Sequence, residues 1–181
     1  MNTTDDAFVH HQLATWQRRI QQTSADLVTP QTGNAQAAFG PLLQQLVSVY
    51  NLSTLLLVHL RQSAESPLAT TDTGRAYLVQ LATALDHTNR AATHLSTAVT
   101  GLADAHRHTP HPGTAAPVES QLSITLGHAA ALRSLQRALA AVTGPLADPP
   151  PATETSSMPV TGEQHQRAAD PSGARPVRRR P

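Results

Sequence analysis

The 181-residue sequence contains no cysteine and no lysine, and only 3% of its residues are aromatic. The lack of cysteine excludes disulfides, thiol catalysis and cysteine-ligated zinc or iron–sulfur sites. The lack of lysine excludes Schiff-base chemistry and a Walker-type phosphate loop. Because hydrophobic residues nevertheless make up 39% of the chain, the core has to be built from Leu, Val and Ala.

Charge is also scarce and unevenly placed. The net charge is +1, and residues 1–146 carry equal numbers of arginines and acids. Such weak charge permits self-association, because little repulsion opposes it. The start, Met1 to Asp6, is acidic and polar, unlike a secretory or mitochondrial leader. We therefore expect a cytoplasmic protein, and the absence of Lys beside abundant Ala, Arg, Pro and Thr is typical of a high-GC bacterial gene.

What the sequence does contain is helical periodicity in four segments. The first segment carries an apolar stripe that follows Asp5 or Asp6 as N-cap, and Pro30 and Gly33 end it. The stripe consists of Val9, Leu13, Trp16, Ile20 and Leu27. The fourth segment follows Pro117 and ends at Gly144-Pro145. Helices are expected at about 6–28, 41–63, 73–107 and 117–143, and the second starts either near Asn34 or at Gly40-Pro41.

The second segment is apolar on nearly every side between Leu42 and Leu60, which predicts a central helix surrounded by others. Its polar interruptions argue against a membrane span, so we expect no membrane contact. These interruptions are Gln44, Gln45, Asn51 and His59.

The third segment has the most regular pattern in the chain, a 3.5-residue repeat over about four heptads. We interpret this seam as a core or interface stripe, in which Thr88 and His106 are polar groups that set the register. Its members are Leu78, Leu81, Leu85, Thr88, Ala92, Leu95, Val99 and Leu102, and His106 continues the spacing.

Four helices and no strand signal predict an all-α fold, an antiparallel four-helix bundle of up-down topology or a close variant, over residues 1–146. The chain changes character after Leu146, since eight of the fourteen prolines lie from Pro145 onward. Residues 147–181 are therefore predicted to be a disordered, Pro/Arg-rich, basic tail.

The ten histidines prompt a search for metal sites. The densest group of possible ligands is Asp104, His106, His108 and His111, and the favoured interpretation is an exposed helix end that binds no specific metal. His128 can face the core and approach His87 or His94. With no Gly-x-Ser-x-Gly, Ser-x-x-Lys or Gly-x-Gly-x-x-Gly motif, we expect neither an enzyme nor a cofactor.

The chain ends in an arginine cluster on the predicted tail, and such a cluster can meet phosphates or an acidic protein surface. The cluster consists of Arg175, Arg178, Arg179 and Arg180. No aromatic residue lies among them, so any nucleic-acid contact is expected to be independent of sequence.

These features predict a non-enzymatic helical bundle that acts through protein–protein contacts, as a homo-oligomer, a scaffold or an accessory subunit. The alternative is a nucleic-acid-associated accessory protein that uses the arginine tail. A third possibility is a metal-binding or enzymatic bundle that uses the His106–His111 cluster.

Overall fold

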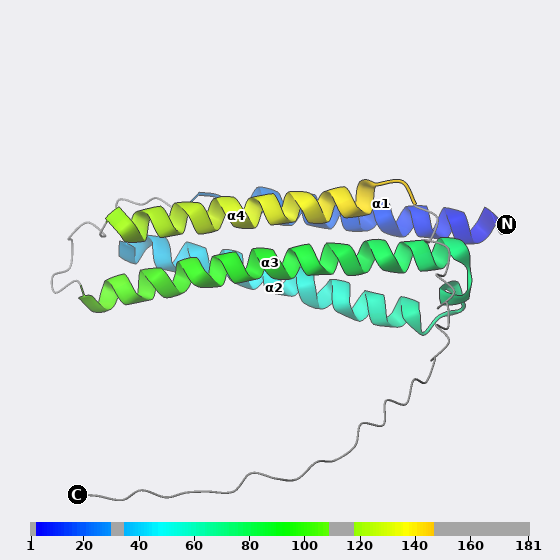
Figure 1. The fold of residues 1–181 in the computed structure, drawn as a ribbon, viewed down its shortest axis with the longest axis horizontal. Coiled ribbons are helices and arrows are strands. Elements are labelled where there is room, and N and C mark those ends of the chain that lie inside the picture. The colour runs from blue at the N-terminus through cyan, green and yellow to red at the C-terminus, as the bar shows by residue number, and fades with distance from the viewer. Residues whose placement is uncertain (1–2, 30–34, 109–117, 147–181) are drawn as a thin grey trace, which may run out of the picture. The chain divides into compact units, whose positions relative to one another are not determined.

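The computed structural model describes residues 3–29, 35–108 and 118–146, and these residues form helices and short connections with no strand (Figure 1). The chain divides into two units, residues 1–150 and 151–181, and the second lies wholly outside the described residues. The predicted all-α class is confirmed. The helices are α1 (Thr3–Asp26), α2 (Ala35–Ala64), the short 3₁₀ helix η1 (Pro67–Thr70), α3 (Asp72–His108) and α4 (Val118–Thr143).

A single hydrophobic cluster is shared by all four α-helices. The α1 stripe predicted from spacing is buried in full, with Val9 and Ile20 completely inaccessible. Asp5 and Asp6 do not cap α1 but lie in its first turn. Negative charge in the first turn interacts favourably with the helix dipole. Side chains three and four residues apart share one helix face, which is why this stripe could be recognised in the sequence.

Of the two starts that the sequence left open for the second helix, the structure has the earlier: α2 begins at Ala35, and Pro41 lies inside it. Proline lacks the amide hydrogen that an interior helical position donates, which favoured the later start at Pro41. Ala38 is buried and Phe39 packs against the core, so the turn before Pro41 is stabilised by tertiary contacts.

The third helix starts from a compact turn. The hydroxyl of Thr71 accepts a hydrogen bond from the backbone amide of Gly74 at 3.0 Å and so caps α3. A side chain at Gly74 has no room, because a Cβ there lies 1.8 Å from the carbonyl oxygen of Leu68 in η1. Glycine at this position therefore allows η1 to pack directly against the start of α3.

The third and fourth helices lie close together at Gly127. A Cβ on Gly127 would lie 3.0 Å from both the Cβ of Ala98 and the carbonyl oxygen of His94. At the other end of α4, the side-chain amide of Gln80 donates to the carbonyl oxygens of Gly144 and Pro145, at 3.1 Å each. This amide satisfies acceptors that the helix end leaves free.

Neighbouring helices are packed to very different degrees. The α3 helix contacts α2 and α4 extensively, and α1 packs mainly on α4 (Figure 1). By contrast, α1 and α2 make few contacts with each other. Two cavities lie between these helices. Trp16 and Arg19 on one side and Leu55 and Val58 on the other line the smaller, of about 170 Å³. Arg19 and Leu55 also line the larger, of about 480 Å³.

Among the described helices, residues 38–64 of α2 are long and apolar enough to cross a membrane by length and composition. A helix in the core of a soluble protein can meet the same criterion, and 33% of the most apolar window of this segment is buried within the chain.

Candidate functional site

The outer face of α2 carries large apolar side chains that the described part of the chain leaves uncovered. The prediction of a helix surrounded by others is therefore wrong for this face. Burial divides the apolar residues of α2 into a core set, such as Leu42, Val49 and Leu56, and an exposed set. The exposed set is Leu43, Val47, Tyr50, Leu55, Leu57 and Val58.

Four of these residues form one straight row, which we call the α2 stripe. Leu43, Val47, Tyr50 and Leu57 follow heptad spacing, and Thr54 and Arg61 complete the series. At 1.5 Å per residue, the series from Leu43 to Arg61 is about 27 Å long. Val47 and Leu57 are each 56% exposed. No Asp, Glu, Lys or Arg occurs between residues 35 and 60, so the stripe is electrically neutral up to Arg61.

Tyr50 connects the α2 stripe to the neighbouring helix. Its hydroxyl lies 3.3 Å from the hydroxyl of Ser96 on α3, within hydrogen-bond distance. The ring itself is half exposed. Tyrosine side chains of this kind are favoured at protein interfaces, because the ring is apolar and the hydroxyl keeps a polar partner.

The heptad seam of α3 faces the interior of the chain. Leu81, Thr88, Ala92, Leu95 and Leu102 are buried. Leu78, Leu85 and Val99 are partly buried. The seam therefore packs against other helices of the same chain. The hydroxyl of Thr88 donates a hydrogen bond to the carbonyl oxygen of Ala84 at 2.7 Å. This bond lies within α3, so the hydroxyl is satisfied without a polar partner on another helix.

A polar cluster that the sequence analysis did not identify joins α1, α2 and α3. Nε2 of His59 lies 2.6 Å from the hydroxyl of Tyr77, and the ring of His59 contacts that of Trp16. Burial raises the pKa of Tyr77 to about 12, outweighing the opposing effect of the Trp16 and Ser63 side chains. Tyr77 therefore keeps its proton at neutral pH, and the tautomer of His59 decides which of the two groups donates in this hydrogen bond. The sequence offered one signal for this cluster: Tyr77 lies four residues before Leu81 of the seam, and residues four apart share a helix face.

His128 is buried near the end of α1, as the sequence suggested for a core-facing histidine. The structure records interactions with the backbone of Leu27 and Val28 rather than with His87 or His94. Burial lowers the pKa of His128, and this outweighs the two backbone hydrogen bonds, which raise it. Nε2 is buried without a hydrogen-bond partner among the described residues. A second proton on this ring would therefore be unsatisfied.

We predict that the free energy of unfolding decreases as the pH falls below the unfolded histidine pKa of 6.5. The folded pKa of His128 is lower than 6.5, so between the two values the unfolded chain binds the proton and is favoured. His59 contributes in the same direction, because burial and then the charge of Arg19 lower its pKa.

Thermal melts between pH 7.5 and pH 5 test this. His128→Leu, which cannot be protonated, should flatten the pH dependence, whereas His10→Leu at an exposed position should not. An equally steep loss in the His128→Leu protein would contradict the assignment.

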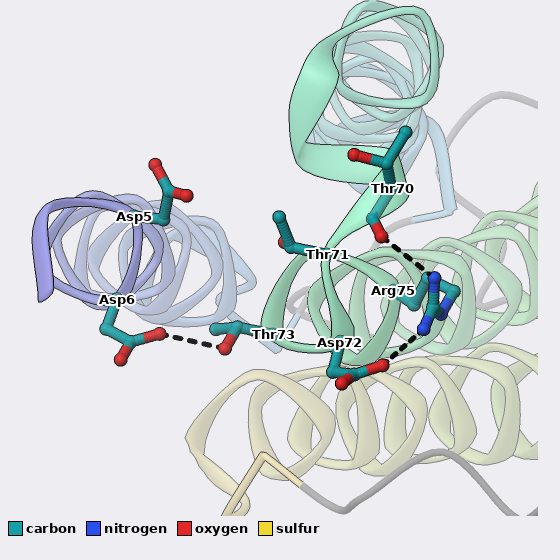
Figure 2. Close-up of a pocket in the computed structure, with 7 residues that line it drawn as sticks. All are labelled: Asp5, Asp6, Thr70, Thr71, Asp72, Thr73 and Arg75. Atoms are coloured by element: carbon teal, nitrogen blue, oxygen red, sulfur yellow. Dashed lines mark hydrogen bonds and ion pairs between the residues drawn. The ribbon is translucent and has the colours of Figure 1, made fainter. Parts of the chain in front are cut away.

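An acidic pocket, shown in Figure 2, lies where the start of α1 meets η1 and the start of α3. The Thr73 hydroxyl donates to Asp6 Oδ1 at 2.8 Å, and Arg75 pairs with Asp72 while donating to the Thr70 carbonyl oxygen. Asp6 and Asp72 are thus engaged within the chain. The polar contacts around this cavity of about 480 Å³ hold the starts of α1 and α3 together. We propose no metal site here.

Among the residues that the structure describes, no group of three or more histidines and acids is placed to hold a metal ion. Of the predicted metal candidates, Asp104 is exposed near the end of α3. The side chains of His106, His108 and His111 lie outside the described residues, so that cluster stays a prediction. The same holds for Arg175, Arg178, Arg179 and Arg180 and for the predicted disorder of residues 147–181.

Comparison with known proteins assigns no relative. No protein family, no curated protein and no solved structure matches this chain. Its function is therefore inferred from its own surface and interior.

Proposed function

We propose that this protein is a non-enzymatic, antiparallel four-helix bundle of up-down topology that acts through protein contact, and that it pairs with a second copy of itself through the α2 stripe. The observation that carries the proposal is the exposure of Leu43, Val47, Tyr50 and Leu57 in one heptad row. Exposed apolar patches of this kind favour association, because covering them removes apolar surface from water.

The proposed topology is supported by contacts between specific helix ends. His59, late in α2, bonds to Tyr77, early in α3, and Gln80, early in α3, bonds to the backbone that follows α4. Gln45, early in α2, contacts the Val28 carbonyl oxygen beyond the end of α1. Each of these contacts fits consecutive helices that run in opposite directions.

A second copy fits the α2 stripe because the spacing of the stripe reads the same in both directions. Residues 43, 47, 50, 54, 57 and 61 are symmetric about position 52. Two antiparallel α2 helices related by a twofold axis there would place Val47 opposite Leu57 and Tyr50 opposite Thr54. Such a self-complementary patch suits an isologous dimer.

Charge favours the same occupant. A neutral apolar row offers nothing to a strongly charged partner, and two copies of it do not repel each other. In the antiparallel arrangement the two Arg61 side chains lie at opposite ends, so like charges do not meet. Each Arg61 is already paired with Glu65 at 2.9 Å.

Light scattering at increasing protein concentration tests the proposal. We expect a mass twice the 19.2 kDa of one chain. The double variant Val47→Glu/Leu57→Glu should be monomeric, because dimerisation would bury its carboxylates in the seam. Val79→Glu is the matched control, since Val79 is an exposed apolar residue on α3 outside the stripe.

Circular dichroism should show the same helical content in all three proteins. A monomeric wild type would overturn the proposal, as would a dimer that persists in the Val47→Glu/Leu57→Glu variant. A lipid surface is the competing occupant of an apolar helix face. A wild-type protein that remains monomeric and sediments with phosphatidylcholine vesicles would replace the proposal with membrane binding.

A further inference from the structure

A small cavity between α1 and α2 lies apart from the α2 stripe and combines apolar walls with unused hydrogen-bond donors. Its volume is about 170 Å³. An apolar cavity of about 150 Å³ is large enough to hold benzene, so this one accepts a group of similar size. It is lined by Gln12, Thr15, Trp16, Arg19, Leu55, Val58, His59 and Gln62.

The charge in the cavity wall is the guanidinium of Arg19. It lies over the Trp16 ring, 5.3 Å from the ring centroid, in a cation–π contact. The ion pairs with Glu65, Asp72 and Asp86 are formed by other arginines, Arg61, Arg75 and Arg90. Asp26, on the same side of α1, accepts a hydrogen bond from Gln22 at 2.9 Å and forms no ion pair with Arg19. Within the described part of the chain, the charge of Arg19 is therefore not compensated by a carboxylate.

His59 adds a neutral polar ring beside this cation. Burial and the charge of Arg19 lower the pKa of His59, so its ring is uncharged at neutral pH. One of its nitrogens, Nε2, is engaged with the Tyr77 hydroxyl. The wall of the cavity thus presents one guanidinium, one neutral imidazole, two side-chain amides and no acid.

We propose that this cavity binds a monoanionic carboxylate attached to a small apolar group. Arg19 pairs with the carboxylate, and the amides of Gln12 and Gln62 supply further donors. The apolar group packs against Leu55, Val58 and the Trp16 ring. The ligand is either a free carboxylic acid or the C-terminal residue of a peptide, since both carry this chemistry.

Several features favour a carboxylate over a phosphate. A single guanidinium balances one negative charge, whereas a phosphate carries up to two at neutral pH and its sites commonly gather several cations or backbone amides. The planar fork of an arginine matches the two oxygens of a carboxylate. The aliphatic wall of Leu55 and Val58 fits the group next to that carboxylate, and a phosphate has no apolar part to place there.

Trp16 is the only tryptophan in the chain, so its fluorescence reports on this cavity directly. Cyclohexanecarboxylate represents a free acid and N-acetylleucine represents a peptide C-terminus. Cyclohexanecarboxamide and N-acetylleucinamide are their uncharged counterparts. We expect a saturable change in Trp16 emission with at least one carboxylate and none with either amide. Binding of cyclohexanecarboxylate would indicate a free acid as the ligand, and binding of N-acetylleucine would indicate a peptide C-terminus.

Arg19→Gln should weaken this binding about tenfold or more, because a charge-assisted hydrogen bond is lost. The matched control is Arg18→Gln, since Arg18 precedes Arg19 but is bonded to the Ala14 carbonyl oxygen and does not line the cavity. Arg18→Gln should bind as the wild type does. Thermal melts should show that both variants are folded.

The proposal is overturned if neither carboxylate alters the emission, if the amides bind equally well, or if Arg19→Gln binds like the wild type. Its failure is distinguishable from that of the proposed self-association, because the mass in solution depends on the α2 stripe. Arg19→Gln is expected to leave that mass unchanged.

Discussion

Replacing Gly127 with leucine is expected to be among the most damaging single substitutions in this protein. The Cβ of any side chain there would lie 3.0 Å from the Cβ of Ala98 and from the His94 carbonyl oxygen, so α3 and α4 must move apart before the rest of the leucine is placed. Overpacking of a dense interface typically costs about 1–3 kcal/mol, and we expect a loss at or above the upper value. Urea unfolding followed by circular dichroism measures it.

Gly101→Ala is the matched control, since Gly101 also lies between α3 and α4. The atom that its side chain would meet is different in kind: a Cβ at Gly101 lies 3.3 Å from the hydroxyl oxygen of Ser123, the end of a side chain that can rotate. We expect this substitution to be neutral or stabilising by up to about 1 kcal/mol, because alanine favours the helix. Comparable losses in Gly127→Leu and Gly101→Ala would show that the close approach at Gly127 is not what limits α3–α4 packing.

Leu95→Ala is expected to lower the free energy of unfolding by about 2–5 kcal/mol. Leu95 is fully buried in the centre of the α3 seam. Its truncation removes buried methyl groups and leaves a cavity that the surrounding helices close only in part. The measurement is again urea unfolding followed by circular dichroism. The protein concentration is chosen so that the wild type and the variant have the same oligomeric state.

Val79→Ala provides the comparison, because Val79 lies on the same helix but is 61% exposed. Its effect should stay within about 0.5 kcal/mol, as is usual for surface positions. A small effect of Leu95→Ala, similar to that of Val79→Ala, would mean that the seam is not part of the stabilising core.

Residues that follow a helical period were the most predictable part of this molecule. Val9, Leu13, Trp16, Ile20 and Leu27 were expected on one face and are all buried. The α3 seam was equally evident, from Leu78 to Leu102. In both cases the signal is local, because residues three and four apart must share a helix face whatever the rest of the chain does.

The second helix was less predictable because it lacks this contrast. Apolar residues lie on nearly every side of α2, so its sequence pattern does not predict which row is covered and which is exposed. Only the positions of α1 and α3 separate the buried Val49 and Leu56 from the exposed Val47 and Leu57. Its start at Ala35 also depended on tertiary contacts of Ala38 and Phe39, which outweigh the presence of Pro41 in the helix.

The sequence by itself determined the all-α class, the core faces of α1 and α3 and the chemistry that missing cysteine and lysine exclude, because composition and periodicity are properties of short stretches of chain. Tertiary structure decided which groups meet. His59 and Tyr77 are brought together from two helices, and Trp16, Arg19 and Val58 line one cavity only because α1 and α2 pack loosely side by side. Contacts between residues distant in sequence depend on how helices pack, and no local pattern encodes that arrangement.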